Sequence, residues 1–277
     1  MPKRLLLSAL VFSSSWLSLA MAAPTGAQCE RLIATGNPEY PPYLWQDPAN
    51  PQKLIGASAD LLAQLGKEIG VEIEVIYAGP WSRAKDEVRT GRIDLVAGVF
   101  LTQARLETID YVHPPYAMEP TMVWVHNGRE ISVDDAHDLK GLTGGTVVGK
   151  SFGDSFDAFR RGHLQLEEVA SLGQAFQKLT LDRTDYVLYE QSPGQAMALA
   201  QGVADQVHQL ERPVALEGLH IGLSHNSACN EPWLRGQLAQ KMTKLVAAGL
   251  PDQLVQTNQA LWLSQQAQPA SDSKANE

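Results

Sequence analysis

The clearest structural pattern of this 277-residue chain lies in the stretch WSRAKDEVRTGRIDLVAGVFLTQARLETIDYVHPPY, from Trp81 to Tyr116. Its apolar residues change period part-way along, which predicts a short helix over 82–90 followed by a buried strand over 93–100. Gly91 lies between the two, and glycine is the residue that most often follows a helix end. A helix followed by an apolar strand is the repeating unit of α/β proteins.

The same alternation continues on both sides of this stretch. Short apolar runs bounded by turn residues predict strands, and amphipathic segments predict helices. The other expected strands are at 31–35, 71–77, 146–149, 166–170 and 186–189. The other expected helices are at 59–69, 155–160, 174–181, 233–247 and 252–263. The pattern predicts two α/β units, the second inserted into the first, with the last two helices returning to cover the first unit.

The two ends of the chain differ in composition from the middle. Two cations precede an apolar run over 5–21, and the run reaches the small-residue pattern Ala20-Met21-Ala22. This order predicts a secretory signal peptide over 1–22 and therefore export to the periplasm. At the other end, residues 266–277 are polar and have no apolar period, so we expect a disordered tail there.

Charge and cysteine content narrow the partners and the compartment. Removing residues 1–22 takes two cations from a formal net charge of −9, and such a negative chain disfavours nucleic acid and anionic membranes as partners. Cys29 and Cys229 would meet an oxidising compartment, where two cysteines are more often bridged than free. We predict a disulfide between them; the alternative is two unpaired thiols. The scattered histidines form no metal motif, so we expect no metal site and no cofactor.

Two short motifs match enzyme patterns without the context that those patterns need. Residues 144–151 match the phosphate-binding loop G-x-x-x-x-G-K-[ST], but Thr146-Val147-Val148 favours a strand where phosphate binding needs a loop. Residues 149–153 match the hydrolase elbow G-x-S-x-G, but the later histidines show no triad pattern. We interpret both as one strand-to-helix turn that faces a cleft.

Five linked elements of the opening stretch resemble the family 3 solute-binding proteins of polar amino-acid ABC transporters. In chain order they are Trp81, Gly91-Arg92-Ile93-Asp94, the strand ending at Phe100, Thr102-Gln103-Ala104-Arg105 and Pro114-Pro115-Tyr116. Further matches are Tyr40-Pro41-Pro42-Tyr43, Gly56 to Leu61, Asp138-Leu139-Lys140-Gly141, Arg183-Thr184-Asp185 and Glu190. The resemblance spans nearly all of the chain between the signal peptide and Leu263.

This resemblance implies an α/β architecture, the type II periplasmic-binding-protein fold, with two α/β lobes joined by a two-segment hinge. Lobe 1 is expected to comprise residues 23–121 and 217–265, and lobe 2 residues 122–216. Crossing segments near 118–125 and 213–219 would form the hinge.

The resemblance also implies roles for single residues. Arg105 matches the arginine that grips a ligand carboxylate, which a guanidinium fork can pair bidentately. Glu190 falls where the family places an aspartate that holds the ligand ammonium. Tyr40, Tyr43 and Trp81 are expected to flank the ligand side chain, and the strand residue Gly98 is expected among the ligand-binding residues. The alternatives are a surface salt bridge for Arg105 and ordinary core packing for the aromatic residues.

Three departures from the family pattern affect the expected ligand. Asn37 stands where binders of basic amino acids carry an aspartate. Phe100 replaces a small hydroxyl residue, which removes a hydrogen bond to the carboxylate and narrows the site. In Gly153-Asp154-Ser155, Asp154 brings a negative charge to a turn that the family offers to the same carboxylate. An amine-bearing, aromatic or modified ligand is therefore an alternative to a plain α-amino acid.

The function that the resemblance implies is capture of a small polar ligand by lobe closure, without catalysis, by a monomer that delivers it to an ABC permease. One alternative is a sensor whose closed form docks on a membrane receptor. A second is a periplasmic dehydratase resembling cyclohexadienyl dehydratases, in which Glu190 would act as the general acid.

Overall fold

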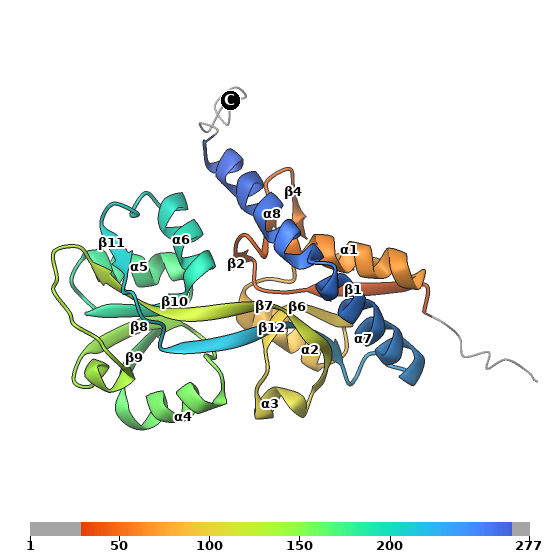
Figure 1. Cartoon of the computed structure of the whole chain (residues 1–277), viewed down its shortest axis with the longest axis horizontal. Coiled ribbons are helices and arrows are strands. Elements are labelled where there is room, and N and C mark those ends of the chain that lie inside the picture. Colours follow the sequence, from red (N-terminus) through yellow and green to blue (C-terminus); the bar gives the residue numbers. More distant parts are fainter. Residues whose placement is uncertain (1–28, 268–277) are drawn as a thin grey trace, which may run out of the picture.

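A computed structural model describes residues 29–267 of the chain, which form a nine-stranded sheet and a three-stranded sheet with helices packed around them (Figure 1). The strands are β1 Arg31–Thr35, β2 Glu39–Tyr40, β3 Leu44–Asp47, β4 Asn50–Ile55, β5 Glu72–Val75, β6 Leu95–Phe100, β7 Ile109–His126, β8 Thr143–Val147, β9 Gln165–Val169, β10 Tyr186–Glu190, β11 Val207–Gln209 and β12 Ala215–Ser224. The helices are α1 Ala57–Ile69, α2 Trp81–Arg89, α3 Gln103–Leu106, α4 Asp154–His163, α5 Leu172–Thr180, α6 Gln191–Ala200, α7 Pro232–Ala247 and α8 Leu250–Ala267. A 3₁₀ helix spans Ala136–Leu139.

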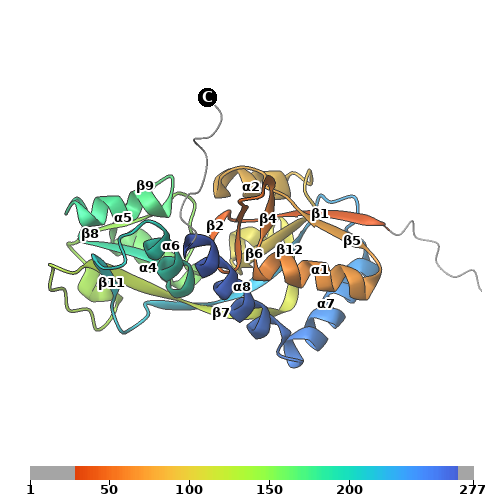
Figure 2. The same ribbon diagram turned by 90° about the horizontal axis from the view of Figure 1, so that it is seen from above.

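The large sheet has the order β5-β1-β6-β12-β7-β10-β8-β9, with β11 paired to β7. Strands β5, β1 and β6 are parallel in one half, which we call lobe 1, and β10, β8 and β9 are parallel in the other, lobe 2. Figures 1 and 2 show the two halves side by side, with β7 and β12 running between them. Two α/β units in one chain agree with the alternation of the sequence.

The crossing between the lobes is a two-stranded antiparallel ribbon. Strand β12 pairs with β6 of lobe 1 as far as the Leu219–Phe100 pair, and β7 pairs with β10 of lobe 2 from the Thr121–Glu190 pair onward. Between these points, residues 118–120 of β7 lie opposite residues 216–218 of β12. Both connections between the lobes therefore pass through a short paired segment.

Packing on the two faces of β10 explains why its sequence is apolar throughout. Tyr186 and Leu188 belong to a core that includes Phe156 of α4, whereas Val187 and Tyr189 belong to a core that includes Phe176 of α5. Because successive side chains of a strand point to opposite faces, a strand covered by helices on both sides is apolar at every position.

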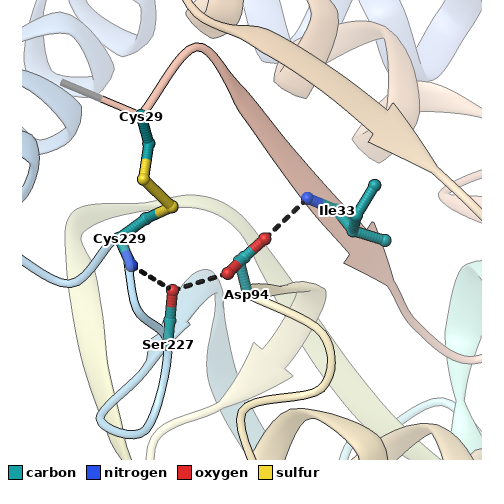
Figure 3. Close-up of a disulfide and its surroundings, with 5 residues drawn as sticks. All are labelled: Cys29, Ile33, Asp94, Ser227 and Cys229. Carbon is teal, nitrogen blue, oxygen red and sulfur yellow. Dashed lines mark hydrogen bonds between the residues drawn. A yellow bond between two sulfur atoms is a disulfide. The ribbon is translucent and has the colours of Figure 1, made fainter. Parts of the chain in front are cut away.

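The predicted disulfide between Cys29 and Cys229 is confirmed (Figure 3). It ends a short network that starts at Asp94, the residue before β6. One carboxylate oxygen of Asp94 accepts a hydrogen bond from the Ile33 backbone N–H at 2.8 Å, and the other accepts one from the Ser227 hydroxyl at 2.6 Å. The Ser227 hydroxyl oxygen accepts the Cys229 N–H at 3.0 Å. The aspartate of the Gly-x-Ile-Asp motif thus joins β1, β6 and the segment that carries the second cysteine.

Lobe 2 contains the same arrangement at the residue before β10. The carboxylate of Asp185 accepts a hydrogen bond from the Thr143 N–H at 2.6 Å, and the Asp185 N–H donates to the Thr143 carbonyl at 2.7 Å. The other carboxylate oxygen pairs with Arg129. The Arg183-Thr184-Asp185 segment, which resembles a ligand-binding turn, here fastens two strands.

The predicted helices and most predicted strands are confirmed within a few residues. The strand expected at 146–149 is β8 and begins three residues earlier, because Gly144 and Gly145 pair with β10. The small sheet of β2, β3 and β4 was not expected. Helix α8 extends to Ala267, so residues 266 and 267 of the expected disordered tail are helical.

Two predictions concern residues outside the described range. The signal peptide over 1–22 and the remainder of the tail, 268–277, are not among the described residues. Within residues 29–267, no helix is both long enough and apolar enough to cross a membrane.

Candidate ligand-binding cleft

A cleft lies between the lobes, at the carboxyl ends of the parallel strands of both. Lobe 1 contributes Asn37, Tyr40, Trp81, Gly98, Phe100 and Arg105, with Val99 and Leu219 beside them, and lobe 2 contributes Lys150, Ser151 and Glu190. The free volume of the cleft in this arrangement is about 30 Å³, far below the roughly 300 to 1,000 Å³ of small-molecule sites, so a ligand needs the lobes or the lining side chains to move apart. Open α/β sheets bind ligands at this edge, because the loops after parallel strands meet there.

Arg105 is the cation of the lobe 1 wall. It lies on α3, whose first turn is capped by the Thr102 hydroxyl, which accepts the Arg105 N–H at 3.3 Å. The guanidinium donates from Nη1 to the Phe100 carbonyl at 2.8 Å. Burial lowers the pKa of Arg105, and the hydroxyl of Tyr111 and nearby carboxylates oppose that shift. An arginine stays charged in such surroundings and has further N–H donors for an anion.

The lobe 2 wall carries a buried ion pair between Lys150 and Glu190. Strands β8 and β10 are parallel, with Gly144 opposite Tyr186, so their carboxyl ends meet at one edge. Lys150 follows β8 and Glu190 ends β10, and Nζ of the lysine lies 2.6 Å from Oε2 of the glutamate. Their side chains are 7% and 0% exposed.

Two tyrosine rings complete the surroundings of the Lys150 ammonium. Its Nζ lies 4.6 Å from the ring centroid of Tyr40 in lobe 1 and 4.1 Å from that of Tyr189 in lobe 2. Such distances give favourable cation–π contacts. Burial lowers the pKa of Lys150, and the charge of Glu190 opposes this effect. Burial raises the pKa of both tyrosines.

Several hydrogen bonds join the lobes across the cleft. Lys85 of α2 donates to the Gly149 carbonyl at 2.8 Å, and its pKa is lowered to about 8, mainly by burial. The Gln103 N–H of α3 donates to Asp154 at 2.7 Å, and Asn37 donates to the Tyr189 hydroxyl at 3.4 Å. The lobes are therefore in contact around the cleft.

Three residues expected at the site lie elsewhere. Tyr43 packs beside Tyr40 and donates its hydroxyl to Glu119, a buried carboxylate of β7 that also accepts from Ser192 at 3.1 Å. Burial raises the pKa of Glu119 to about 7. Asp154 is exposed at the start of α4, where it accepts the bond from α3, and its neighbour Ser155 is exposed as well. Neither lines the cleft.

The sequence prediction missed three polar groups of the lobe 2 wall. Lys150 and Ser151 line the cleft, and Tyr189 contacts the Lys150 ammonium. The signal for the first two was the match to G-x-x-x-x-G-K-[ST], whose first glycines lie in β8 and not in a loop. Gly149 has φ of 71°, a conformation that glycine adopts readily, and this turn places Lys150 over the cleft.

The serine of the G-x-S-x-G match at residues 149–153 makes hydrogen bonds within its own turn. The Ser151 hydroxyl donates to Asp157 of the same turn and accepts the Gly153 N–H at 3.3 Å. The buried His220 contacts the Val112 carbonyl on β7 instead. Among residues 29–267, no cluster of three or more His, Cys, Asp or Glu could hold a metal ion.

Comparisons with known proteins agree with this architecture. A family model described as bacterial extracellular solute-binding proteins, family 3, matches residues 32–261. No curated protein sequence matches the chain. An ancestral arginine-binding protein bound to glutamine has a TM-score of 0.66 and 21% identity, covering 82% of this chain and 97% of the other.

Two further solved structures have similar folds. An amino acid ABC transporter substrate-binding protein from Streptococcus pneumoniae, bound to L-arginine, has a TM-score of 0.67 and 17% identity, covering 84% of this chain and 96% of the other. A histidine kinase sensor domain with similarity to periplasmic binding proteins has a TM-score of 0.69 and 18% identity, covering 86% and 98%.

The fold is thus the type II periplasmic-binding-protein fold, with two α/β lobes, two crossing strands and a cleft between them. Because the family model spans most of the sequence, the chain belongs to the bacterial extracellular solute-binding proteins, family 3.

Proposed function

We propose that this chain is a periplasmic solute-binding protein that captures a small polar ligand, an amino acid or a related amine or carboxylate, by closing its lobes around it. The observation that carries the proposal is the placement of Arg105 and the Lys150–Glu190 pair on opposite walls of one cleft. Side chains of both walls can contact one ligand only when the walls are together, so ligand binding favours the closed state.

The hinge of this clamp is the ribbon formed by β7 and β12. Lobe 1, expected over residues 23–121 and 217–265, is described from residue 29 onward, and lobe 2 comprises residues 122–216, with the hinge near 118–125 and 213–219. Residues 118–120 pair with residues 216–218 and with no strand of either parallel sheet. This supports the division, because a rotation at this point disturbs neither sheet.

We expect the chain to act as a monomeric, non-catalytic carrier that delivers its ligand to an ABC permease. Membership of the solute-binding family supports this role. The similarity to a transporter substrate-binding protein supports it at the level of fold. The similarity to a histidine kinase sensor domain supports the alternative, in which the closed form docks on a membrane receptor. Measuring which membrane protein the closed form binds separates the two. Turnover of a prephenate-like compound would instead support the dehydratase alternative.

The test is a thermal-shift screen of the chain, unfolded and refolded with its disulfide intact to strip carried-over ligand. Amino acids, polyamines, small carboxylates and aromatic acids form the panel. A ligand at about 100 times its dissociation constant adds roughly 2.7 kcal/mol to the free energy of unfolding. We expect at least one class to raise the melting temperature, and no shift from any class would contradict the proposal.

The residue-level test compares Arg105→Ala with Arg89→Ala. Arg89 is an exposed arginine on α2 whose side chain pairs with Asp86 at the surface. For the compound found in the screen, Arg105→Ala is expected to weaken binding by about 2 to 5 kcal/mol, and Arg89→Ala to leave it unchanged. Equal affinity of the Arg105 variant and the wild type would remove Arg105 from the site.

A further inference from the structure

The cation position of the cleft is filled by the protein itself. The ammonium of Lys150 lies 2.6 Å from Glu190 and within 4.6 Å of two tyrosine ring centroids. A carboxylate flanked by aromatic faces is the surrounding that a ligand ammonium would need. The ammonium of Lys150 occupies this position.

The Lys150–Glu190 pair is neutral however its proton is shared. An ammonium beside a carboxylate carries no net charge, and neither does an amine beside a carboxylic acid. In either form the pair offers a second cation no net negative charge; Oε1 of Glu190, which has no hydrogen-bond partner among the described residues, is left as an acceptor for a neutral donor. The other buried carboxylate nearby, Glu119, accepts hydrogen bonds from Tyr43 and Ser192 and does not line the cleft.

A ligand ammonium would have to expel Lys150 from a site where its side chain is only 7% exposed. A cation left beside Arg105 without a partner carboxylate would be repelled and poorly hydrated. An anion meets no such obstacle, because Arg105 is the remaining charge among the residues that line the cleft. Further N–H donors of its guanidinium can pair with a carboxylate.

Apart from Arg105, Asn37 and Tyr40, the side chains of the lobe 1 wall are apolar. The Asn37 amide already donates to the Tyr189 hydroxyl and accepts the Glu39 N–H. Trp81, Phe100 and Leu219 line the cleft, and all three are at least nine-tenths buried in the closed arrangement. Phe100 stands at the end of β6, where its ring offers no hydrogen bond to a ligand. The body of a ligand held on Arg105 would lie against these side chains.

We propose that the ligand is a small monocarboxylate with an apolar body and no α-ammonium group, and that Lys150 determines this specificity. The inference rests on the proposed function, since it assumes that the cleft binds a ligand. It differs from the α-amino acid expected from the resemblance, and the reason is one residue, Lys150, that the sequence comparison did not assign.

The test uses matched probes that differ in a single group. They are 3-phenylpropanoate, L-phenylalanine and 2-phenylethylamine, and the aliphatic set 4-methylpentanoate, L-leucine and 3-methylbutylamine. Isothermal titration calorimetry on the refolded wild-type chain measures each dissociation constant. In at least one set, we expect the carboxylate to bind at least about tenfold more tightly than its amino acid, which corresponds to about 1.4 kcal/mol, and the amine not to bind.

Variants then test whether Lys150 is the cause. Lys150→Met frees Glu190, so the amino acid should gain affinity by at least about tenfold relative to the matched carboxylate. Lys150→Met with Glu190→Gln removes the freed carboxylate, so this gain should disappear. Lys67→Met, at an exposed lysine of α1, is the control and should reproduce the wild-type order. The wild-type comparison stands even where a variant fails to fold.

The outcomes separate this inference from the proposed function. An amino acid that binds the wild type as tightly as its carboxylate, or an order that Lys150→Met leaves unchanged, overturns the inference and leaves the binding protein intact. Failure of all six probes, while the broader screen finds another ligand class, likewise overturns only the inference. Failure of every compound in both experiments overturns the two together.

Discussion

Asp94 in lobe 1 and Asp185 in lobe 2 precede equivalent central strands and make the same two-point contact with the neighbouring strand. They differ in the third partner. The second carboxylate oxygen of Asp94 accepts the Ser227 hydroxyl, which in turn accepts the N–H of the disulfide-bonded Cys229. The second carboxylate oxygen of Asp185 pairs with Arg129, whose side chain is 37% exposed. At this point lobe 1 therefore has a covalent bond, and lobe 2 has a partly exposed ion pair.

The cleft shows a second difference between the lobes. Lobe 2 supplies both members of the Lys150–Glu190 pair, and lobe 1 supplies one cation, Arg105. The following predictions test whether the two lobes are held in these different ways.

The largest effect is expected at the buried pair of lobe 2. Glu190→Ala leaves Lys150 buried without its carboxylate and should lower the free energy of unfolding by about 3 to 5 kcal/mol. Lys150→Met with Glu190→Gln removes both charges and should lose much less. Urea unfolding of the ligand-free chain measures both. If the single and double variants lose the same amount, the ion pair is not what holds this part of lobe 2.

The disulfide of lobe 1 should come next. Cys29 and Cys229 are 200 residues apart in sequence, so the bond restricts a long loop of the unfolded chain. Replacing both by serine should lower the free energy of unfolding by about 2 to 5 kcal/mol. Ligand affinity should be unchanged, because neither cysteine lines the cleft. A loss below about 1 kcal/mol would mean that the Asp94 network alone secures lobe 1.

Asp94→Ala and Asp185→Ala should have similar, smaller effects. Each removes the acceptor for a half-buried backbone N–H, at Ile33 or Thr143, and each should cost about 1 to 3 kcal/mol. Chemical unfolding of the two variants side by side checks this. Clearly unequal losses would show that the third partner, and not the shared contact, dominates the aspartate's contribution.

Arg129→Ala should have the smallest effect. Its partner is Asp185, but a partly exposed ion pair contributes about 0 to 1 kcal/mol. Added salt should weaken even this contribution, since it screens exposed charges. Unfolding at low and high ionic strength provides the measurement. A salt-independent decrease of more than about 2 kcal/mol in the free energy of unfolding would contradict the expectation that the Arg129–Asp185 pair contributes little to stability.

Local patterns in the sequence determined most of the fold. The period of apolar residues predicted six of the eight α-helices described in residues 29–267, and α3 and α6 were missed. The small sheet of β2, β3 and β4 escaped prediction because its strands are short and partly exposed. All ten expected site residues came from the family resemblance. Seven of them line the cleft, Arg105 and Glu190 among them, whereas Tyr43, Asp154 and Ser155 do not.

Local pattern and cysteine content were enough to predict the α/β class and the disulfide partners, and the family resemblance predicted the arginine that faces the cleft. The position of Lys150 beside Glu190 could not be predicted from either, because it depends on how the strands pair. The two residues lie far apart in sequence, and the parallel pairing of β8 and β10 brings their strand ends to one edge. Such a contact depends on register and burial, which no local pattern of residues records.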